Sequence, residues 1–289
     1  DGIIITDGME MGGLTESSWA GESAIRAVEA GADILLLPMD VDHTINSLLK
    51  AVESGRLSEE RINQSVRRIW HMKNKTGLLD GNYQLSFEEL EKIIGNPEHK
   101  KIALAIAQKS ITVVKDINNQ LPLQVERIDS LAHIILSLDE NAQNYLKLFN
   151  RDIHRTHGHV KEIFVNNPLT ELGRLDIQNQ LEGINQAIIS ILVRIRMDKG
   201  ISTIDATHSL LLSELKDLGI PMVTFSFGSP YLPYYKMLET YVCTFNYGSI
   251  SMIAAADALW GRSVVNGVLP VDLNSKYFRG SGISKKKRN

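Results

Sequence analysis

The chain has 289 residues, 43% of them hydrophobic, which is enough to bury a core in one or two domains. A formal net charge of −3 at pH 7 excludes any general attraction to nucleic acid or anionic membranes. No apolar run of about 18 residues occurs, so we expect no membrane insertion. Cys243 is the single cysteine, which excludes an intrachain disulfide, and its apolar neighbours predict a buried, inert thiol.

The first 76 residues alternate between strand and helix patterns. Apolar runs at residues 3–5 and 34–37 are typical of strands buried on both faces. Helices are predicted at residues 19–29, 42–53 and 58–75, with Ser58 as the N-cap of the last. This order indicates two consecutive βα units of a parallel α/β domain. Two units cannot close a barrel, so we expect a fragment whose strands expose apolar faces.

A second α/β pattern follows residues 77–97, a polar, glycine-containing stretch that we interpret as a linker. Strands and helices alternate again over residues 98–275 and predict a complete α/β layer domain. Its strands are predicted at residues 111–114, 132–137, 162–165, 187–194, 222–227, 241–245 and 268–273. Its helices are predicted at residues 99–109, 140–150, 169–182, 206–218 and 249–260. The basic tail, residues 276–289, is expected to be disordered.

Asp7 is the strongest candidate for a catalytic residue. It follows the apolar run at residues 3–5, at the carboxyl end of a predicted parallel strand, where α/β barrels place catalytic groups. An aspartate in this position can also cap a turn. Spacing alone leaves both interpretations open.

Several segments resemble glycoside hydrolase family 3. Residues 1–11, DGIIITDGMEM, closely resemble the family's nucleophile segment, in which an apolar strand ends in Ser/Thr-Asp. Residues 30–38, AGADILLLP, resemble the final barrel strand, and residues 51–62 resemble the helix pair that closes the barrel. Further segments that resemble the second domain of the family are residues 107–116, 121–123, 226–231 and 267–271. The matches occur in the family's order over most of the chain.

The resemblance implies an α/β fold in two parts. Residues 1–76 would form the last two βα units of a truncated (β/α)8 TIM-type barrel, and residues 98–275 an α/β sandwich domain. The implied reaction is retaining hydrolysis of a β-glycoside, with Asp7 as the nucleophile that forms a covalent glycosyl-enzyme. Met9 and Met11 would line the sugar site, although packing explains them equally well. We expect a carbohydrate as the substrate and no metal or organic cofactor.

The acid/base residue stays open. In the N-acetylglucosaminidase branch it is a His on an earlier barrel loop, and in the β-glucosidase branch a Glu of the second domain. Glutamates that could serve there are Glu140, Glu162, Glu171, Glu182, Glu214 and Glu239. Residues 226–231 favour the first branch, and therefore exo-hydrolysis of terminal β-linked N-acetylhexosamine by a β-N-acetylhexosaminidase. The alternatives are a β-glucosidase and a catalytically inactive glycan-binding or structural relative. The chain by itself is expected to be inactive.

Two clusters have simpler interpretations than catalysis. His154, His157 and His159 could bind a metal, but they fall in a predicted loop with no acidic residue placed beside them. Arg194 and Arg196 lie at the end of a predicted strand, where an ordinary salt bridge is the simpler explanation.

Overall fold

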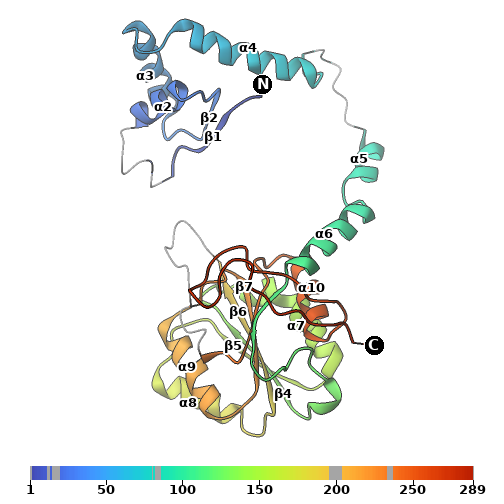
Figure 1. The fold of residues 1–289 in the computed structure, drawn as a ribbon. Helices are drawn as coiled ribbons and strands as arrows, with labels where there is room; N and C mark the ends of the chain where they lie inside the picture. The colour runs from blue at the N-terminus through green and yellow to red at the C-terminus, as the bar shows by residue number, and fades with distance from the viewer. Residues whose placement is uncertain are drawn as a thin grey trace. The chain divides into compact units, whose positions relative to one another are not determined.

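The computed structural model describes residues 2–11, 14, 20–79, 81, 86–194, 204–232 and 237–288. The chain divides into two compact units, Asp1–Lys92 and Ile93–Asn289 (Figure 1). Both units combine helices with parallel strands, as the alternating patterns predict.

Residues 2–11 and 20–75 of the first unit form two parallel strands and three helices, and residues 87–92 form most of a further, short helix. Strand β1 (Ile5–Gly8) pairs in parallel with β2 (Ile34–Leu36). The helices are α2 (Ala20–Glu29), α3 (Val41–Glu53) and α4 (Glu59–Lys75). All five elements fall within four residues of their predicted positions, but β1 begins later than the apolar run and includes Asp7.

Local signals in the sequence account for the helix limits. After α2, Gly31 adopts a φ of 112°, a conformation that glycine allows without steric penalty. The Asp40 side chain caps α3 by accepting a hydrogen bond from the amide of His43. Ser58 caps α4 in the same way, by accepting from the amide of Arg61, so the predicted N-cap is confirmed.

The hydrophobic core of the first unit is small. Its buried members are Ile25, Val28, Ala51 and Leu57. In contrast, large apolar side chains on both strands and along α3 are exposed: Ile4, Ile5, Leu36, Leu37, Val41, Ile45 and Leu49. The expectation that the two strands expose their apolar faces is confirmed.

The predicted linker contains helical structure. Helix α5 (Phe87–Ile93) lies within it, and α6 (Pro97–Ser110) begins at its end. Helix α6 has favourable starting residues, because Asn96 caps it and Pro97 occupies the first turn. Helix α5 has only seven residues and buries none of them, and an apolar pattern this short does not by itself identify a helix in the sequence.

The second unit is built around a six-stranded sheet in the order β3-β8-β7-β6-β4-β5. Its strands are β3 (Thr112–Asp116), β4 (Leu131–Leu136), β5 (Val160–Val165), β6 (Gln186–Val193), β7 (Met222–Gly228) and β8 (Thr240–Cys243). All neighbours are parallel except β3, which runs antiparallel to β8. The sequence predicted these six strands and misplaced their ends by no more than two residues.

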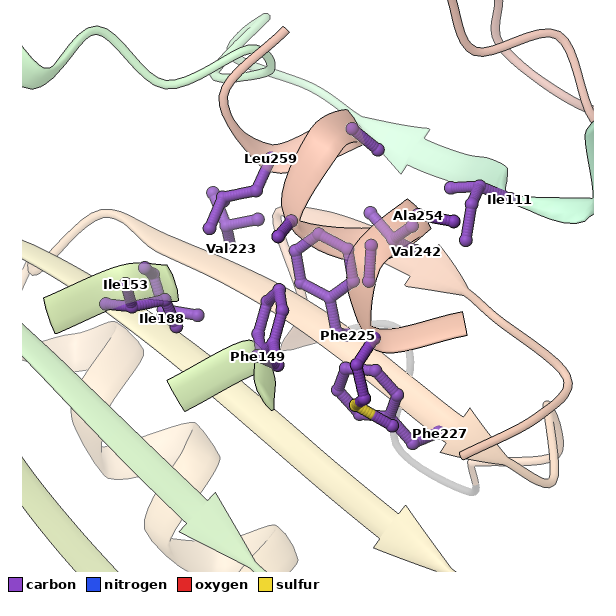
Figure 2. Close-up of a cluster of buried hydrophobic side chains, with 14 of the residues drawn as sticks. Ile111, Phe149, Ile153, Ile188, Val223, Phe225, Phe227, Val242, Ala254 and Leu259 are labelled. Carbon is purple, nitrogen blue, oxygen red and sulfur yellow. The ribbon is translucent and has the colours of Figure 1, made fainter. Parts of the chain in front are cut away.

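Helices cover both faces of this sheet. Helices α6, α7 (Ala142–His157) and α10 (Ser249–Leu259) contribute to the hydrophobic cluster on one face. Helices α8 (Glu171–Gln180) and α9 (Ala206–Asp217) contribute to the cluster on the other. On the first face, the ring of Phe149 packs 5.1 Å from that of Phe225 and 5.2 Å from that of Phe227, measured between centroids (Figure 2).

Two secondary-structure predictions for this unit were wrong. Residues 268–273 form no strand; Pro270 within them lacks the amide that a sheet ladder needs. His154 and His157 lie in α7 rather than in a loop, because the helix continues to Gly158, which ends it at a φ of 83°. Polar and histidine-rich residues face outward there, and their composition concealed the helix.

The basic tail, expected to be disordered, instead lies against the second unit. Ile283 pairs with Val113, and Lys285 pairs with Val265. The ammonium group of Lys285 forms an ion pair with Asp116, whose side chain is fully buried. The tail is held because a buried carboxylate supplies the counter-charge, which a run of basic residues does not reveal.

Candidate active site

Asp7 lies near the carboxyl end of β1, beside the carboxyl end of β2. Its side chain is exposed, and its Oδ1 atom accepts a hydrogen bond from the amide of Gly8 at 2.8 Å. Since the two strands are parallel, both end at the same edge of the sheet. The carboxylate is therefore accessible at the edge where α/β barrels place catalytic groups.

The pairing of β1 with β2 is irregular at Asp7. Ile5 lies opposite Ile34, and Gly8 lies opposite Leu36, so β1 advances three residues while β2 advances two. The extra residue is a β-bulge, a feature that redirects side chains and occurs often beside active sites. Across it, the amide of Leu36 donates to the hydroxyl of Thr6 at 2.9 Å.

A buried carboxylate holds the other end of β1. The side chain of Asp33 is fully buried, and its Oδ2 atom accepts from the amide of Ile4 at 3.0 Å. Its Oδ1 atom accepts from the Ser65 hydroxyl at 2.6 Å and from Arg68 at 3.0 Å, both on α4. Hydrogen bonds, first from Ser65 and then from Ile4, lower the pKa of Asp33 to about 2. This ionised group joins β1 to α4.

Leu37, directly after β2, has a strained backbone. Its φ of 47° lies in the left-handed region, which a leucine adopts at a penalty of roughly 1 kcal/mol. A Cβ atom on Gly8 would lie 3.8 Å from Leu37 Cδ1 and 4.0 Å from Met11 Cγ. The strained residue is therefore close to the Asp7 loop, and strain of this kind is concentrated at functional sites.

The two methionines of the loop differ in exposure. Met9 is buried, at 7% exposure, and its amide donates to the carbonyl of Leu36 at 2.9 Å. Met11 is partly exposed. Met9 is thus held in the packing of the strand pair, whereas Met11, close to Gly8, keeps part of its surface exposed.

The six candidate glutamates divide into two groups. Three have side-chain partners: Asn150, Gln143 and His154 for Glu162, Arg174 and Gln178 for Glu214, and Gln120 for Glu239. Burial acts to raise the pKa of Glu162, but hydrogen bonds from Asn150 and His154 outweigh it and lower the pKa. A general acid needs a raised pKa, so Glu162 does not fit that role. Glu140, Glu171 and Glu182 are exposed.

The remaining candidate residues have structural roles. Arg194 forms an ion pair with Asp139 at 2.7 Å and lies 4.5 Å from the ring centroid of Tyr145, so the salt bridge expected there is confirmed. Arg196 lies outside the described residues. Burial raises the pKa of the Cys243 thiol to about 12, which confirms an inert thiol.

The histidines do not form a metal site. Both ring nitrogens of His157 lie within 2.9 Å of backbone carbonyls, and His154 pairs with Glu162. No group of three or more potential metal ligands occurs in the part of the chain that the structure describes. Within that same part, none of the helices is both long and apolar enough to cross a membrane.

Sequence reasoning missed Asp33 and the role of Thr6. Asp33 could have been suspected, because a charged residue directly before an apolar strand is unusual and needs a partner. The position of Thr6 opposite the Leu36 amide depends on the bulge, and no local pattern predicts a bulge.

The segment that carries Asp7 matches a known family. Residues 1–72 match the glycosyl hydrolase family 3 N terminal domain. The resemblance seen in the sequence is thereby confirmed.

The curated relatives that the chain resembles have different names. The chain is 30% identical over 135 residues to a lysosomal beta glucosidase of Dictyostelium discoideum, which covers 45% of the chain and 16% of the relative. It is 35% identical over 144 residues to a beta-xylosidase of Formosa agariphila, an alignment that covers 46% of the chain and 20% of the relative. It is 25% identical over 162 residues to beta-hexosaminidase A of Pseudoalteromonas piscicida, an alignment that covers 50% of the chain and 26% of the relative. The aligned segments thus span about a quarter or less of these relatives.

Solved structures share the fold over nearly the whole chain. A beta-glucoside phosphorylase has a TM-score of 0.75 and 24% identity, covering 94% of this chain and 49% of the phosphorylase. A family 3 beta-N-acetylglucosaminidase of Paenibacillus has a TM-score of 0.70 and 23% identity, covering 94% and 51%. These similarities establish an α/β fold with a sheet of mainly parallel strands.

Proposed function

We propose that this chain is part of a retaining β-glycosidase in which Asp7 is the nucleophile. The observation that carries the proposal is the accessible Asp7 carboxylate at the carboxyl edge of β1 and β2, within the segment that matches family 3. In this mechanism a carboxylate oxygen of Asp7 attacks the anomeric carbon while an acid protonates the departing oxygen. Water, deprotonated by the same acid/base group, then displaces Asp7 and releases the sugar.

The proposal assigns β1 and β2 to a (β/α)8 barrel, as its last two strands. The exposed apolar side chains of both strands and of α3 support this assignment, since parallel strands are normally covered on both faces. The unit's small core agrees with it, because a two-stranded sheet needs further elements for stability. Residues 1–76 would then be barrel, residues 77–97 the connection, and residues 98–275 the second domain.

For the substrate, we favour a terminal β-linked N-acetylhexosamine. Three of the six glutamates that could act as acid/base are engaged by other side chains, and the hydrogen bonds to Glu162 hold its pKa low. This supports an acid/base group outside the second unit, as in the N-acetylglucosaminidase branch. A β-glucosidase is the second candidate, because one relative, from Cellulomonas fimi, is named beta-N-acetylglucosaminidase/beta-glucosidase. Met11, which is accessible, is the methionine that we place against the sugar.

The test compares this chain alone with the same chain preceded by the rest of the barrel. Each is assayed on p-nitrophenyl N-acetyl-β-glucosaminide and on the β-glucoside. We expect no turnover by the chain alone, and activity on the first substrate by the protein with a complete barrel. Replacement of Asp7 by Asn should reduce kcat by at least about 10⁴-fold, because the covalent step is lost.

Asp42→Asn is the matched control, since Asp42 is exposed on α3 and distant in sequence from the nucleophile. A full loss in Asp7→Asn with normal activity in the control supports the assignment. Preference for the glucoside would select the second candidate. Turnover that survives Asp7→Asn would refute the nucleophile, and binding of glycans without any turnover would indicate the inactive relative.

A further inference from the structure

Two side-chain hydrogen bonds hold the segment that leads into Asp7, one at Ile4 and one at Thr6. At the amino-terminal end, the carboxylate of Asp33 accepts from the amide of Ile4. At the bulge, the hydroxyl of Thr6 accepts from the amide of Leu36 at 2.9 Å. Asp7 lies next to Thr6 in the irregular part of the ladder, so the direction of its side chain depends on the bulge.

The hydrogen bond from the Leu36 amide to the Thr6 hydroxyl depends on the bulge, and this hydrogen bond in turn stabilises the bulge. In a regular strand the side chains stand perpendicular to the sheet, out of line with the amides of the neighbouring strand. A hydroxyl can accept from such an amide where a bulge rotates its residue, and it then provides an acceptor where the regular ladder is interrupted. If the register of β1 shifted by one residue, the side chains of Asp7 and Thr6 would each move to the other face of the sheet.

We propose that Thr6 is a positioning residue for Asp7: its hydroxyl accepts the Leu36 amide, holds the bulge in one register and thereby fixes the direction of the Asp7 carboxylate. This inference rests on the proposed function of Asp7. The role requires a hydroxyl acceptor at residue 6. Serine also supplies one, whereas valine, which has the same shape as threonine, does not. Thr6 itself takes no part in bond making.

The test compares Thr6→Val with Thr6→Ser. In the 289-residue chain, hydrogen exchange of the Leu36 amide is measured by NMR. We expect at least about tenfold faster exchange in Thr6→Val and near wild-type exchange in Thr6→Ser, because only the serine retains an acceptor. The amide of Ile34 is an internal control, since it lies on the same strand but donates to the carbonyl of Ile4.

Kinetics of the protein with a complete barrel give the second measurement. Misplacement of a reacting group by about 1 Å can reduce turnover about 100-fold, so we expect kcat to fall between about 10- and 100-fold in Thr6→Val. KM should stay within about threefold, and Thr6→Ser should recover most of kcat. A purely structural role would reduce the amount of folded enzyme without this dependence on the hydroxyl.

Three results would overturn the proposal. The first is wild-type exchange at Leu36 in Thr6→Val. The second is equal acceleration at Leu36 and Ile34, which would indicate general loosening of the strand pair. The third is a Thr6→Ser enzyme as impaired as Thr6→Val. Absence of wild-type activity on any β-glycoside would instead refute the proposed function, and the exchange measurement would still decide whether the hydroxyl fixes the register.

Discussion

Buried His133 should make the stability of the second unit depend on pH. The side chain lies on β4 with no exposed surface, and its ring is edge-on to Phe149 at 5.9 Å between centroids. Its Nδ1 atom lies 2.8 Å from Asn150 Oδ1, and its Nε2 atom lies 2.8 Å from the Ser190 hydroxyl. Because Asn150 donates its own amide to Glu162, its oxygen faces His133, which assigns the proton of the neutral ring to Nδ1.

Burial lowers the pKa of His133 from 6.5 to about 4, and the hydrogen bond to Asn150 offsets only part of this effect. The unfolded chain therefore binds a proton between these two values that the folded chain does not. The contribution of neutral His133 to the stability of the fold is therefore fully present above pH 6.5 and is lost as the pH falls toward 4. A difference of this size corresponds to about 3 kcal/mol in total, of which about 2 kcal/mol should be lost between pH 7 and pH 5.

The assay is chemical denaturation at several pH values, followed by the fluorescence of Trp260. This residue is buried in the second unit, and replacing Trp19 and Trp70 by Phe removes the other two tryptophans. His133→Gln should be less stable than the reference at pH 7 and should lose about 2 kcal/mol less between pH 7 and pH 5. His99→Gln, an exposed histidine on α6, should keep the reference slope. Equal slopes in the reference and His133→Gln would refute the reasoning.

Two further predictions concern the second unit. Gly228→Ala should destabilise it by about 3 kcal/mol, since φ is 95° and the new Cβ would lie 2.4 Å from a backbone carbonyl. Gly183→Ala, also at positive φ but in open space, should lose only about 1 kcal/mol, and equal losses would count against the steric argument. Lys285→Met should reduce the free energy of unfolding by about 3 kcal/mol, because it leaves buried Asp116 without its cation. In the same denaturation experiment, replacement of exposed Lys286 by Met should be neutral. Two neutral variants would mean that the ion pair does not hold the tail.

Local patterns in the sequence identified most elements of the fold. Apolar runs and helical periodicity depend on neighbours within one or two turns, so the strands and helices of both units were predictable. The Ser58 cap was predictable for the same reason, as was a carboxylate at residue 7 near the end of a strand. The family resemblance added the role of Asp7 as nucleophile, which spacing alone left open.

Other features depend on residues far apart in the sequence. The strand order β3-β8-β7-β6-β4-β5 and the antiparallel edge follow from pairing across the whole unit. The tail lies against the second unit because the buried carboxylate of Asp116, about 170 positions earlier, forms an ion pair with Lys285. A histidine is unexpected in the apolar strand that contains His133. Only the tertiary structure shows that Asn150 and Ser190 lie beside its ring nitrogens.

For the candidate site, the sequence by itself determined which residue carries the carboxylate and on which kind of strand it lies. The tertiary structure alone decided that Asp7 stands at a bulge, directly after Thr6, which is bonded to Leu36, and three residues after Ile4, which is bonded to Asp33. The physical reason is that register and bulges are set by the pairing of two strands about 30 residues apart, whereas composition and periodicity describe each strand separately.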